Sequence, residues 1–263
     1  MSNTMKRIAD TGLVPVVVID DASKAVATGR AMAEGGVDIM EITLRTEAGM
    51  ESIANVIKEC PDILVGGGTV LTLDKCKEAI KLGAKFIVSP GYNPEIVHYC
   101  LDNGISVCPG CVTPTEIDTA IRAGISVIKF FPANVYGGIK AIKSLAGPFG
   151  GVQFIPTGGV ALNNLVDFID PSVYAVGGGW LCDRSAINKG DFASITEICK
   201  KSIDVLLGLK SGDTAITLDE LMAKGGTVTT INKNRTVSQL SRRGFVQNPD
   251  GTLSREGIVV TLA

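Results

Sequence analysis

The sequence lacks the features that mark several classes of protein. Its formal net charge is only -2, with 25 Lys and Arg against 27 Asp and Glu and no long basic run. Nucleic-acid binding therefore has no electrostatic support, because it requires clustered positive charge. No stretch of about 18 uninterrupted apolar residues occurs, so we expect no membrane-spanning helix. The apolar run near the N-terminus is only about eight residues long, is followed directly by acids and lacks a small-residue cleavage site, so it is not read as a signal peptide.

Histidine and paired cysteines are also scarce. His98 is the only histidine, and the seven cysteines are an odd number scattered along the chain. This suits reduced thiols in a cytoplasmic protein better than a disulfide framework. Cys108 and Cys111 form a CPGC motif, which could be a redox pair or half of a zinc site. A structural zinc site normally needs two further ligands, so we favour two strand-end cysteines in a buried run and expect no metal.

What the sequence has is one repeated theme. A short apolar, β-branched run ends in Gly, Pro or Thr, and an amphipathic stretch follows it. The runs are LVPVVVI (13–19), DIMEITLR (38–45), ILVGGGTV (63–70), KFIVSP (85–90), SVCPGCV (106–112), SVIKFFPA (126–133), VQFIPTGGV (152–160) and VYAVGGGW (173–180). Such alternation indicates βαβ units and a parallel sheet. Eight units in about 205 residues predict a (β/α)8 TIM barrel over residues 1–209 and favour it over an open doubly wound sheet.

Helix signals fill the gaps between these runs. Apolar residues recur at helical spacing over Ser23 to Ala33, and Thr72 to Leu82 closes at a glycine. The segment Pro114 to Ala123 starts with proline at a first helical position, after Thr113 as a cap. These stretches are the expected outer helices of the repeat.

Residues 210–263 have a different texture. Residues 210–213 resemble a linker, and we predict a strand over 227–231, a helix over 234–243 and a hairpin around 248–251. This α+β extension of βαββ type is too small to hold much core alone. We therefore expect it to dock on the barrel or on a partner chain.

A lysine within apolar surroundings is the most informative single residue. Lys129 lies between Ile128 and Phe130 in IKFFPA, although lysine is almost never fully buried without a partner. Burial disfavours the charged form of a lysine, and a free amine can attack a ketone to form an iminium. The alternative is a structural ion pair inside the barrel.

The alternation of side chains along a strand predicts which residues share a face with one another. Side chains alternate in a strand, so Lys129 shares a face with Phe131, while Glu41, Thr43 and Arg45 share a face of the second run. Polar side chains on an inner face are costly unless they pair with one another or with a ligand. Glu41 could move protons and Arg45 could bind a carboxylate, or the two could simply pair with each other.

Glycines follow the seventh and eighth runs. Thr157-Gly158-Gly159 and Gly177 to Gly179 occupy the loops that form the frequent phosphate site of barrels, and bare amides with a helix N-terminus can hold phosphate. The GGGTV segment at 66–70 lacks the spacing of a dinucleotide fingerprint. We expect Thr69, Pro90 and Thr113 to line the pocket.

Seven motifs in this order carry a family resemblance: EITLRT, VGGGTVLT, FIVSPG, GCVTPTE, IKFFPA, PTGGV and VGGGWL. They resemble the bifunctional 2-dehydro-3-deoxy-6-phosphogluconate (KDPG) and 4-hydroxy-2-oxoglutarate (KHG) aldolases over about residues 5–208. The resemblance implies a class I lyase of the Entner–Doudoroff route that releases pyruvate, with glyceraldehyde 3-phosphate or glyoxylate as the other product. It also implies no cofactor and a homotrimer.

The resemblance assigns roles residue by residue. Lys129 matches the Schiff-base lysine, Glu41 the acid/base and Arg45 the carboxylate-binding arginine. Substrate-pocket positions are Thr69, Pro90, Phe131 and Thr157, and phosphate-binding positions are Gly158, Gly159, Gly178 and Gly179.

Two departures keep alternatives open. Many relatives read GGSWL where this chain has Gly179, and the missing hydroxyl is worth about 0.5 to 1.5 kcal/mol if it bonded the phosphate. An unphosphorylated 2-keto-3-deoxy acid is therefore an alternative substrate. The galactonate epimer of the phospho sugar acid is another, because hydroxyl stereochemistry depends on details of the pocket. A non-catalytic sugar-phosphate binding barrel is a different class, but it would not need Lys129 and Glu41 together. The tail faintly resembles a glyoxalase-like module without its histidine ligands, which suggests a degenerate module for packing or assembly.

Overall fold

Each of the eight apolar runs contains one strand of a parallel α/β fold. The structure is a computed structural model and describes residues 2–263. The strands are β1 (Leu13–Val17), β2 (Ile39–Thr43), β3 (Leu64–Gly68), β4 (Phe86–Val88), β5 (Ser106–Cys108), β6 (Val127–Phe130), β7 (Gln153–Pro156) and β8 (Val176–Gly178). Apolar, β-branched segments bounded by glycine and proline thus formed strands as expected.

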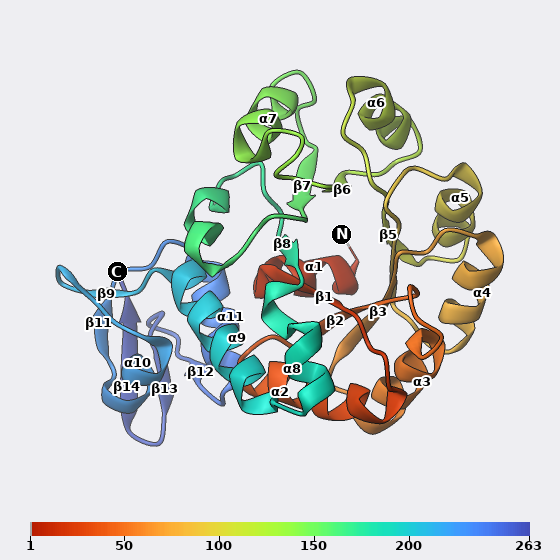
Figure 1. Cartoon of the computed structure of the whole chain (residues 1–263). Helices are drawn as coiled ribbons and strands as arrows, with labels where there is room; N and C mark the ends of the chain where they lie inside the picture. Colours follow the sequence, from red (N-terminus) through yellow and green to blue (C-terminus); the bar gives the residue numbers. More distant parts are fainter. Residues whose placement is uncertain (1) are drawn as a thin grey trace.

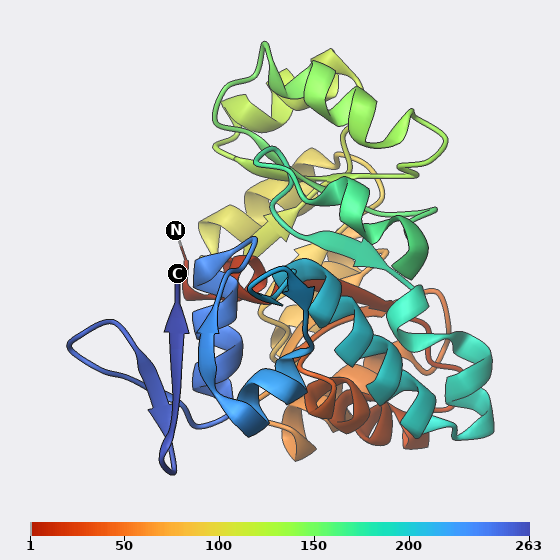
Figure 2. The same ribbon diagram turned by 90° about the vertical axis from the view of Figure 1, so that its left-hand side faces the viewer.

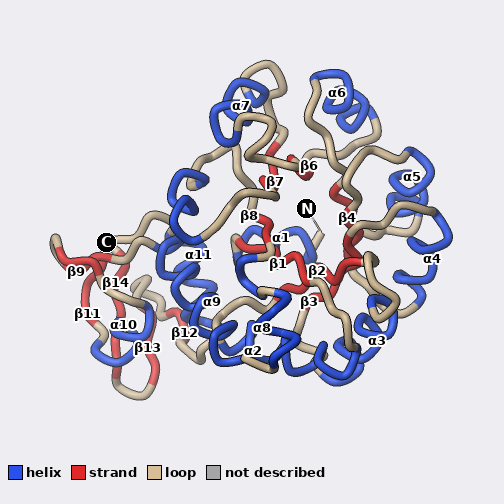
Figure 3. The backbone as a smooth tube through the Cα atoms, viewed as in Figure 1, coloured by secondary structure: helices blue, strands red, loops and turns tan. Residues whose placement is uncertain are grey.

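The strands pair with their neighbours in sequence. One parallel sheet has the order β5-β4-β3-β2-β1-β8, and β6 pairs with β7 in parallel. A bridge between Gly110 and Lys129 joins the end of β5 to β6, and bridges from Phe154 to Val173 and from Thr157 to Gly177 join β7 to the β8 segment. Figures 1 and 3 show the helices arranged around the outside of these strands. The sequential order does not match a doubly wound sheet, in which the strand order reverses.

Most of the helices that accompany these strands begin at a residue whose side chain caps the first turn. The helices are α1 (Asn3–Thr11), α2 (Ala25–Glu34), α3 (Gly49–Glu59), α4 (Leu73–Lys81), α5 (Pro94–Asp102), α6 (Pro114–Arg122), α7 (Gly138–Ala146), α8 (Arg184–Lys189) and α9 (Phe192–Leu207), with short 3-10 turns at Ala22–Lys24, Leu162–Phe168 and Trp180–Cys182. Thr113 caps α6 in a capping box with Glu116, as the sequence predicts for the cap. Within residues 2–263, no helix combines the length and apolar character needed to cross a membrane.

Two apolar clusters pack on the two faces of the strands, and the face turned away from the outer helices is called the inner face here. Ile39 belongs to the inner cluster with Phe86 and Val127, whereas Met40 and Ile42 pack outward against the helices. The Ile8 side chain of α1 joins the inner cluster from the amino end of the strands. This alternation leaves Glu41 and Lys129 on the inside.

The tail has more secondary structure than expected. Its elements are β9 (Lys210–Ser211), β10 (Thr214–Ala215), α10 (Leu218–Lys224), β11 (Gly226–Val228), α11 (Lys233–Arg242), β12 (Val246–Gln247), β13 (Leu253–Arg255) and β14 (Ile258–Leu262). The expected linker is a short hairpin of β9 and β10, and the four-stranded sheet has the order β11-β14-β13-β12.

Two local signals account for the differences in the tail. Thr217 and Glu220 form a capping box that starts α10, a signal that the sequence analysis missed. Glu256 and Gly257 both have positive φ, at 51° and 84°, and this two-residue turn reverses the chain between β13 and β14. Positive φ at both central residues is the geometry of a tight hairpin turn, so the last apolar run is a separate strand.

Helix α11 docks the tail on the amino ends of the strands. Its Arg235 donates hydrogen bonds to the carbonyl oxygens of Ala9 and Tyr174, both at 3.0 Å. Gln239 donates to the carbonyl oxygen of Gly36 at 3.0 Å. Figure 2 shows α11 and the tail's sheet together on one side of the molecule.

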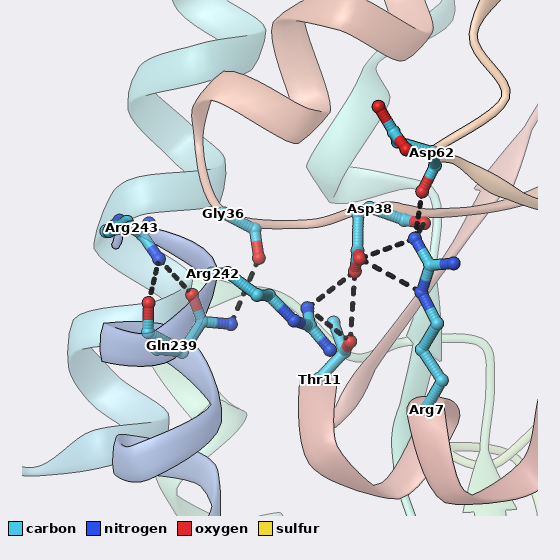
Figure 4. Close-up of polar contacts among 8 residues, drawn as sticks. All are labelled: Arg7, Thr11, Gly36, Asp38, Asp62, Gln239, Arg242 and Arg243. Atoms are coloured by element: carbon cyan, nitrogen blue, oxygen red, sulfur yellow. Dashed lines mark hydrogen bonds and ion pairs between the residues drawn. The ribbon is translucent and has the colours of Figure 1, made fainter. Parts of the chain in front are cut away.

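An aspartate shared by two arginines completes this contact (Figure 4). Asp38, immediately before β2, accepts from Arg7 of α1 and from Arg242 of α11, each at 2.6 Å. Arg242 also donates to the Thr11 hydroxyl at 2.9 Å. The network thus ties the tail to α1 and to the β2 entry, away from the carboxyl ends of the strands.

We expect Arg242→Ala to loosen the tail without unfolding the strands. Asp38 keeps Arg7 as a partner, so the loss is about 1 kcal/mol, the scale of a partly exposed ion pair with one further hydrogen bond. Hydrogen exchange should rise in α11 while β1 to β5 stay protected. Arg122→Ala removes a more exposed pair with Asp118 and is the control. Equal exchange in α11 of both variants would contradict this role of Arg242.

Candidate active site

A buried ion pair lies at the centre of the site. Lys129 on β6 donates to Glu41 on β2, with 3.3 Å between Nζ and Oε1. Lys129 is 6% exposed and Glu41 is 2% exposed. The Lys129 ammonium also lies 5.4 Å from the centre of the Phe131 ring, within cation–π range. The ion pair that the sequence left open between Glu41 and Arg45 is instead made between Glu41 and Lys129.

The CPGC segment binds both backbone hydrogen-bonding groups of Lys129. The Lys129 N–H donates to the Pro109 carbonyl, and the Cys111 N–H donates to the Lys129 carbonyl, both at 3.0 Å. A Cβ on Gly110 would lie 2.0 Å from the Pro90 carbonyl oxygen, so glycine is needed where these two loops cross. The motif therefore positions the lysine through its main chain.

The thiols of the same segment are buried. Burial raises the pKa of both Cys108 and Cys111 to about 12, so both are protonated at neutral pH and poor nucleophiles. Among residues 2–263, no cluster of three or more His, Cys, Asp or Glu is arranged to hold a metal ion.

The environment of Glu41 is set by burial and by a glycine. Burial raises the pKa of Glu41 above 4.5, against the opposing effects of Lys129 and Arg45. A Cβ on Gly68 of β3 would lie 2.5 Å from Glu41 Oε1. Glycine at the end of β3 therefore makes the space in which this carboxyl group lies.

A cavity of about 560 Å³ opens above the pair, at the carboxyl ends of the strands. The predicted residues that line it are Arg45, Thr69, Pro90, Lys129, Phe131, Thr157, Gly158, Gly159, Gly178 and Gly179. Glu41 lies beneath Lys129 and does not line this cavity. The expectation for Thr113 is wrong, because its side chain is engaged as the cap of α6 and it is not among the lining residues.

Unusual backbone conformations concentrate at the cavity. Thr69 has a φ of 53°, which is strained for a β-branched residue. Gly158 and Gly159 have φ values of 93° and 75°, and a Cβ on Gly159 would meet the Asn134 side chain at 2.3 Å. Arg45 is exposed and, within the described chain, makes no hydrogen bond or ion pair with another residue.

Sequence reasoning missed two charged groups at the cavity, Asp183 and Arg184. Arg184, at the start of α8, lines the cavity beside the glycines. Its Nε and Nη2 donate to the two carboxylate oxygens of Asp20 at 2.8 and 2.6 Å. These bonds and one from Asn188 lower the pKa of Asp20 to about 2. The dipeptide Asp183-Arg184, shortly after the eighth run, was the available signal. Asp20, the partner of Arg184, lies 164 residues away in sequence.

Comparison with known proteins agrees with this geometry. The family model for KDPG and KHG aldolase matches residues 4–198. A 2-dehydro-3-deoxy-phosphogluconate aldolase of Treponema pallidum is 42% identical over 74% of this chain and 93% of its own length. The KHG/KDPG aldolase of Escherichia coli K12 is 37% identical over 75% and 93%.

A solved structure supports the same relationship. KDPG aldolase from Legionella pneumophila, captured with pyruvate as a covalent carbinolamine, has a TM-score of 0.73 and 33% identity. The match covers 75% of this chain and 97% of that one. The chain therefore belongs to the KDPG and KHG aldolase family.

Proposed function

We propose that the chain is a class I aldolase, a lyase that cleaves KDPG to pyruvate and glyceraldehyde 3-phosphate. The observation that carries this is the buried pair of Lys129 and Glu41 at the floor of an open cavity. A sugar-phosphate binding protein would have no use for a buried amine beside a proton acceptor. The Legionella relative, which holds pyruvate covalently, supports the same chemistry.

The pair can carry the reaction without a cofactor. Lys129, once it gives a proton to Glu41, attacks the substrate ketone to form a carbinolamine. Glu41 returns that proton to the departing hydroxyl group, so loss of water leaves a protonated imine and an ionised Glu41. The C3–C4 bond then breaks, and its electron pair moves toward the imine nitrogen to give an enamine. Glu41 accepts the proton of the C4 hydroxyl group as the aldehyde leaves. Protonation of the enamine and hydrolysis by water release pyruvate and restore the amine.

The lining residues divide between the two ends of the substrate. Arg45 has its donors free to bind the substrate carboxylate in bidentate fashion. Thr69, Pro90, Phe131 and Thr157 surround the carbon chain. The phosphate is assigned to Gly158, Gly159, Gly178 and Gly179. 4-Hydroxy-2-oxoglutarate would undergo the same steps and give glyoxylate.

We further infer the larger organisation of the chain. The bridges beside β6 and β8 support closure of the eight strands into one (β/α)8 barrel over residues 1–209, with residues 210–263 as a small extension. The strand–helix order of β11 and α11 supports the origin of that extension as a glyoxalase-like module, and its lack of histidine supports the view that the module is degenerate. The family supports a homotrimer, and Val135 and Tyr136, 72% and 49% exposed, offer apolar surface for it. The seven unpaired thiols support a cytoplasmic location.

Borohydride trapping with pyruvate tests the function directly. We expect a reduced pyruvyl adduct on Lys129, located by peptide mass mapping. Lys129→Arg keeps a charge beside Glu41 but should form no adduct and lose more than about 1000-fold in kcat. Circular dichroism checks that the variant is folded. A folded wild-type chain without an adduct, or with one on another lysine, would sink the proposal.

The pH dependence should report on Glu41. The carboxyl group must be ionised to accept a proton, so kcat/KM should fall as the pH decreases through its pKa, which burial raises above 4.5. Glu41→Gln should lower kcat by about 100- to 10,000-fold and remove that acid limb. If the variant keeps the same acid limb as the wild type, another group performs the proton transfer.

Gly68→Ala should disturb the reaction through Glu41. The added Cβ would lie 2.5 Å from Oε1, and displacement of the carboxyl group should lower kcat by about 10- to 100-fold. Gly91→Ala is the matched control, because its Cβ would meet nothing within 4 Å. Steady-state pyruvate release measures both. Unchanged turnover in Gly68→Ala would show that the position of Glu41 does not limit the rate.

Gly179→Ser tests the phosphate assignment. A Cβ there would have its nearest neighbour, the Val16 carbonyl oxygen, at 3.7 Å, and the φ of -86° suits any residue. We expect the new hydroxyl to lower KM for KDPG about two- to tenfold by one added hydrogen bond. The unphosphorylated analogue, 2-keto-3-deoxygluconate, should not benefit. An equal change for both substrates would place the phosphate elsewhere.

A further inference from the structure

Arg184 is held in a fixed orientation at the mouth of the cavity. Its side chain is 59% exposed, yet the guanidinium group makes a two-pronged contact with Asp20. Asn188, four residues further along α8, donates to the same carboxylate at 2.8 Å. Residues four apart lie on one face of a helix, so α8 presents both side chains to Asp20. An exposed arginine fixed in this way is pre-oriented for a ligand.

The contact with Asp20 leaves most of the arginine donors available. A guanidinium group has five N–H donors, and only one on Nε and one on Nη2 are used. Within residues 2–263, the remaining donors have no acceptor. The planar group is suited to bind phosphate oxygens through such paired donors.

The position of Arg184 matches the assigned phosphate end of the cavity. The bridge between Thr157 and Gly177 brings the glycines after β7 next to those after β8, and β8 pairs with β1. Arg184 follows β8, and Asp20 follows β1, so their ion pair spans the carboxyl ends of these two strands. The other arginine that lines the cavity, Arg45, follows β2 instead.

The nearby acid does not cancel this arrangement. Asp183 also lines the cavity, but its carboxylate accepts hydrogen bonds from the backbone N–H groups of Ser185 and Ala186 at 2.9 and 3.1 Å. The Asp183 carboxylate therefore caps the first turn of α8. Glu41 is covered by Lys129. Arg184 is the lining arginine that follows β8, and its donors not bound to Asp20 remain available to an incoming anion.

We propose that Arg184 binds the distal phosphate of the substrate and that Asp20 is its positioning residue. The proposal rests on the aldolase function above and names a further residue that determines its substrate class. In a site whose Gly179 carries no hydroxyl group, the guanidinium supplies side-chain hydrogen bonds that select KDPG over the unphosphorylated 2-keto-3-deoxygluconate.

The test compares Arg184→Gln, Arg184→Lys and Asp20→Asn in the full chain with both substrates. For Arg184→Gln we expect KM for KDPG to rise about 10- to 100-fold, the scale of one or two hydrogen bonds to a charged group. Its kcat should stay within about threefold, and kcat/KM for 2-keto-3-deoxygluconate within about twofold. Arg184→Lys should recover part of the loss, and Asp20→Asn should raise KM by a smaller factor. Inorganic phosphate should inhibit the wild type competitively and Arg184→Gln less.

Controls separate this proposal from the aldolase function. Arg122→Gln removes an exposed arginine paired with Asp118 away from the cavity and should leave every parameter unchanged. Pyruvate trapping on Lys129 should persist in Arg184→Gln.

If trapping fails in the wild type, the aldolase function itself falls. If trapping persists but Arg184→Gln affects both substrates equally or neither, Arg184 does not bind the phosphate. A selective loss with 4-hydroxy-2-oxoglutarate instead of KDPG would assign the arginine to a distal carboxylate, which would also overturn the proposal.

Discussion

The buried contact between Lys129 and Glu41 is the constraint on which the interior of the protein depends. Burial of two ionisable groups among apolar side chains costs free energy unless the groups bind each other. Here one hydrogen bond of 3.3 Å joins them. The surrounding strands are adjusted to this pair. Gly68 leaves space for the carboxyl group, and Gly110 lets the CPGC segment approach closely enough to bond the Lys129 backbone. The same burial that makes the pair costly raises the pKa of Glu41 above its usual range.

The two ends of the strands have separate tasks. At the carboxyl ends the loops are open and hold the cavity, with Thr69 in a strained conformation. At the amino ends, α1 closes the inner cluster with Ile8, and α11 fastens the tail through Arg235 and Arg242. The tail therefore contacts the main chain of segments that support the strands, and none of its residues lines the cavity.

Much of the fold and part of the site could be predicted because their signals are local. Each strand lies in an apolar run, most of which end at glycine or proline, and period-two alternation placed Lys129 and Glu41 on the same face. Local signals were missed where they are short, as in the hairpin turn at Glu256 and Gly257. The contact of Arg184 with Asp20 could not be predicted, since it joins segments 164 residues apart through side chains alone. The role of the CPGC motif was hidden for a similar reason, because its backbone and not its thiols makes the contact.

The charges at the cavity explain how a substrate with two anionic groups can be bound and still be released. Lys129 is neutralised by Glu41, and Arg184 is largely neutralised by Asp20, so only Arg45 among the lining cations lacks a partner acid in the described chain. The net field is therefore weak, and attraction depends on directed hydrogen bonds more than on charge. Cleavage divides the two anionic groups between pyruvate and the aldehyde, so each product keeps only one set of contacts. Each product then leaves more readily than the intact substrate, as turnover requires.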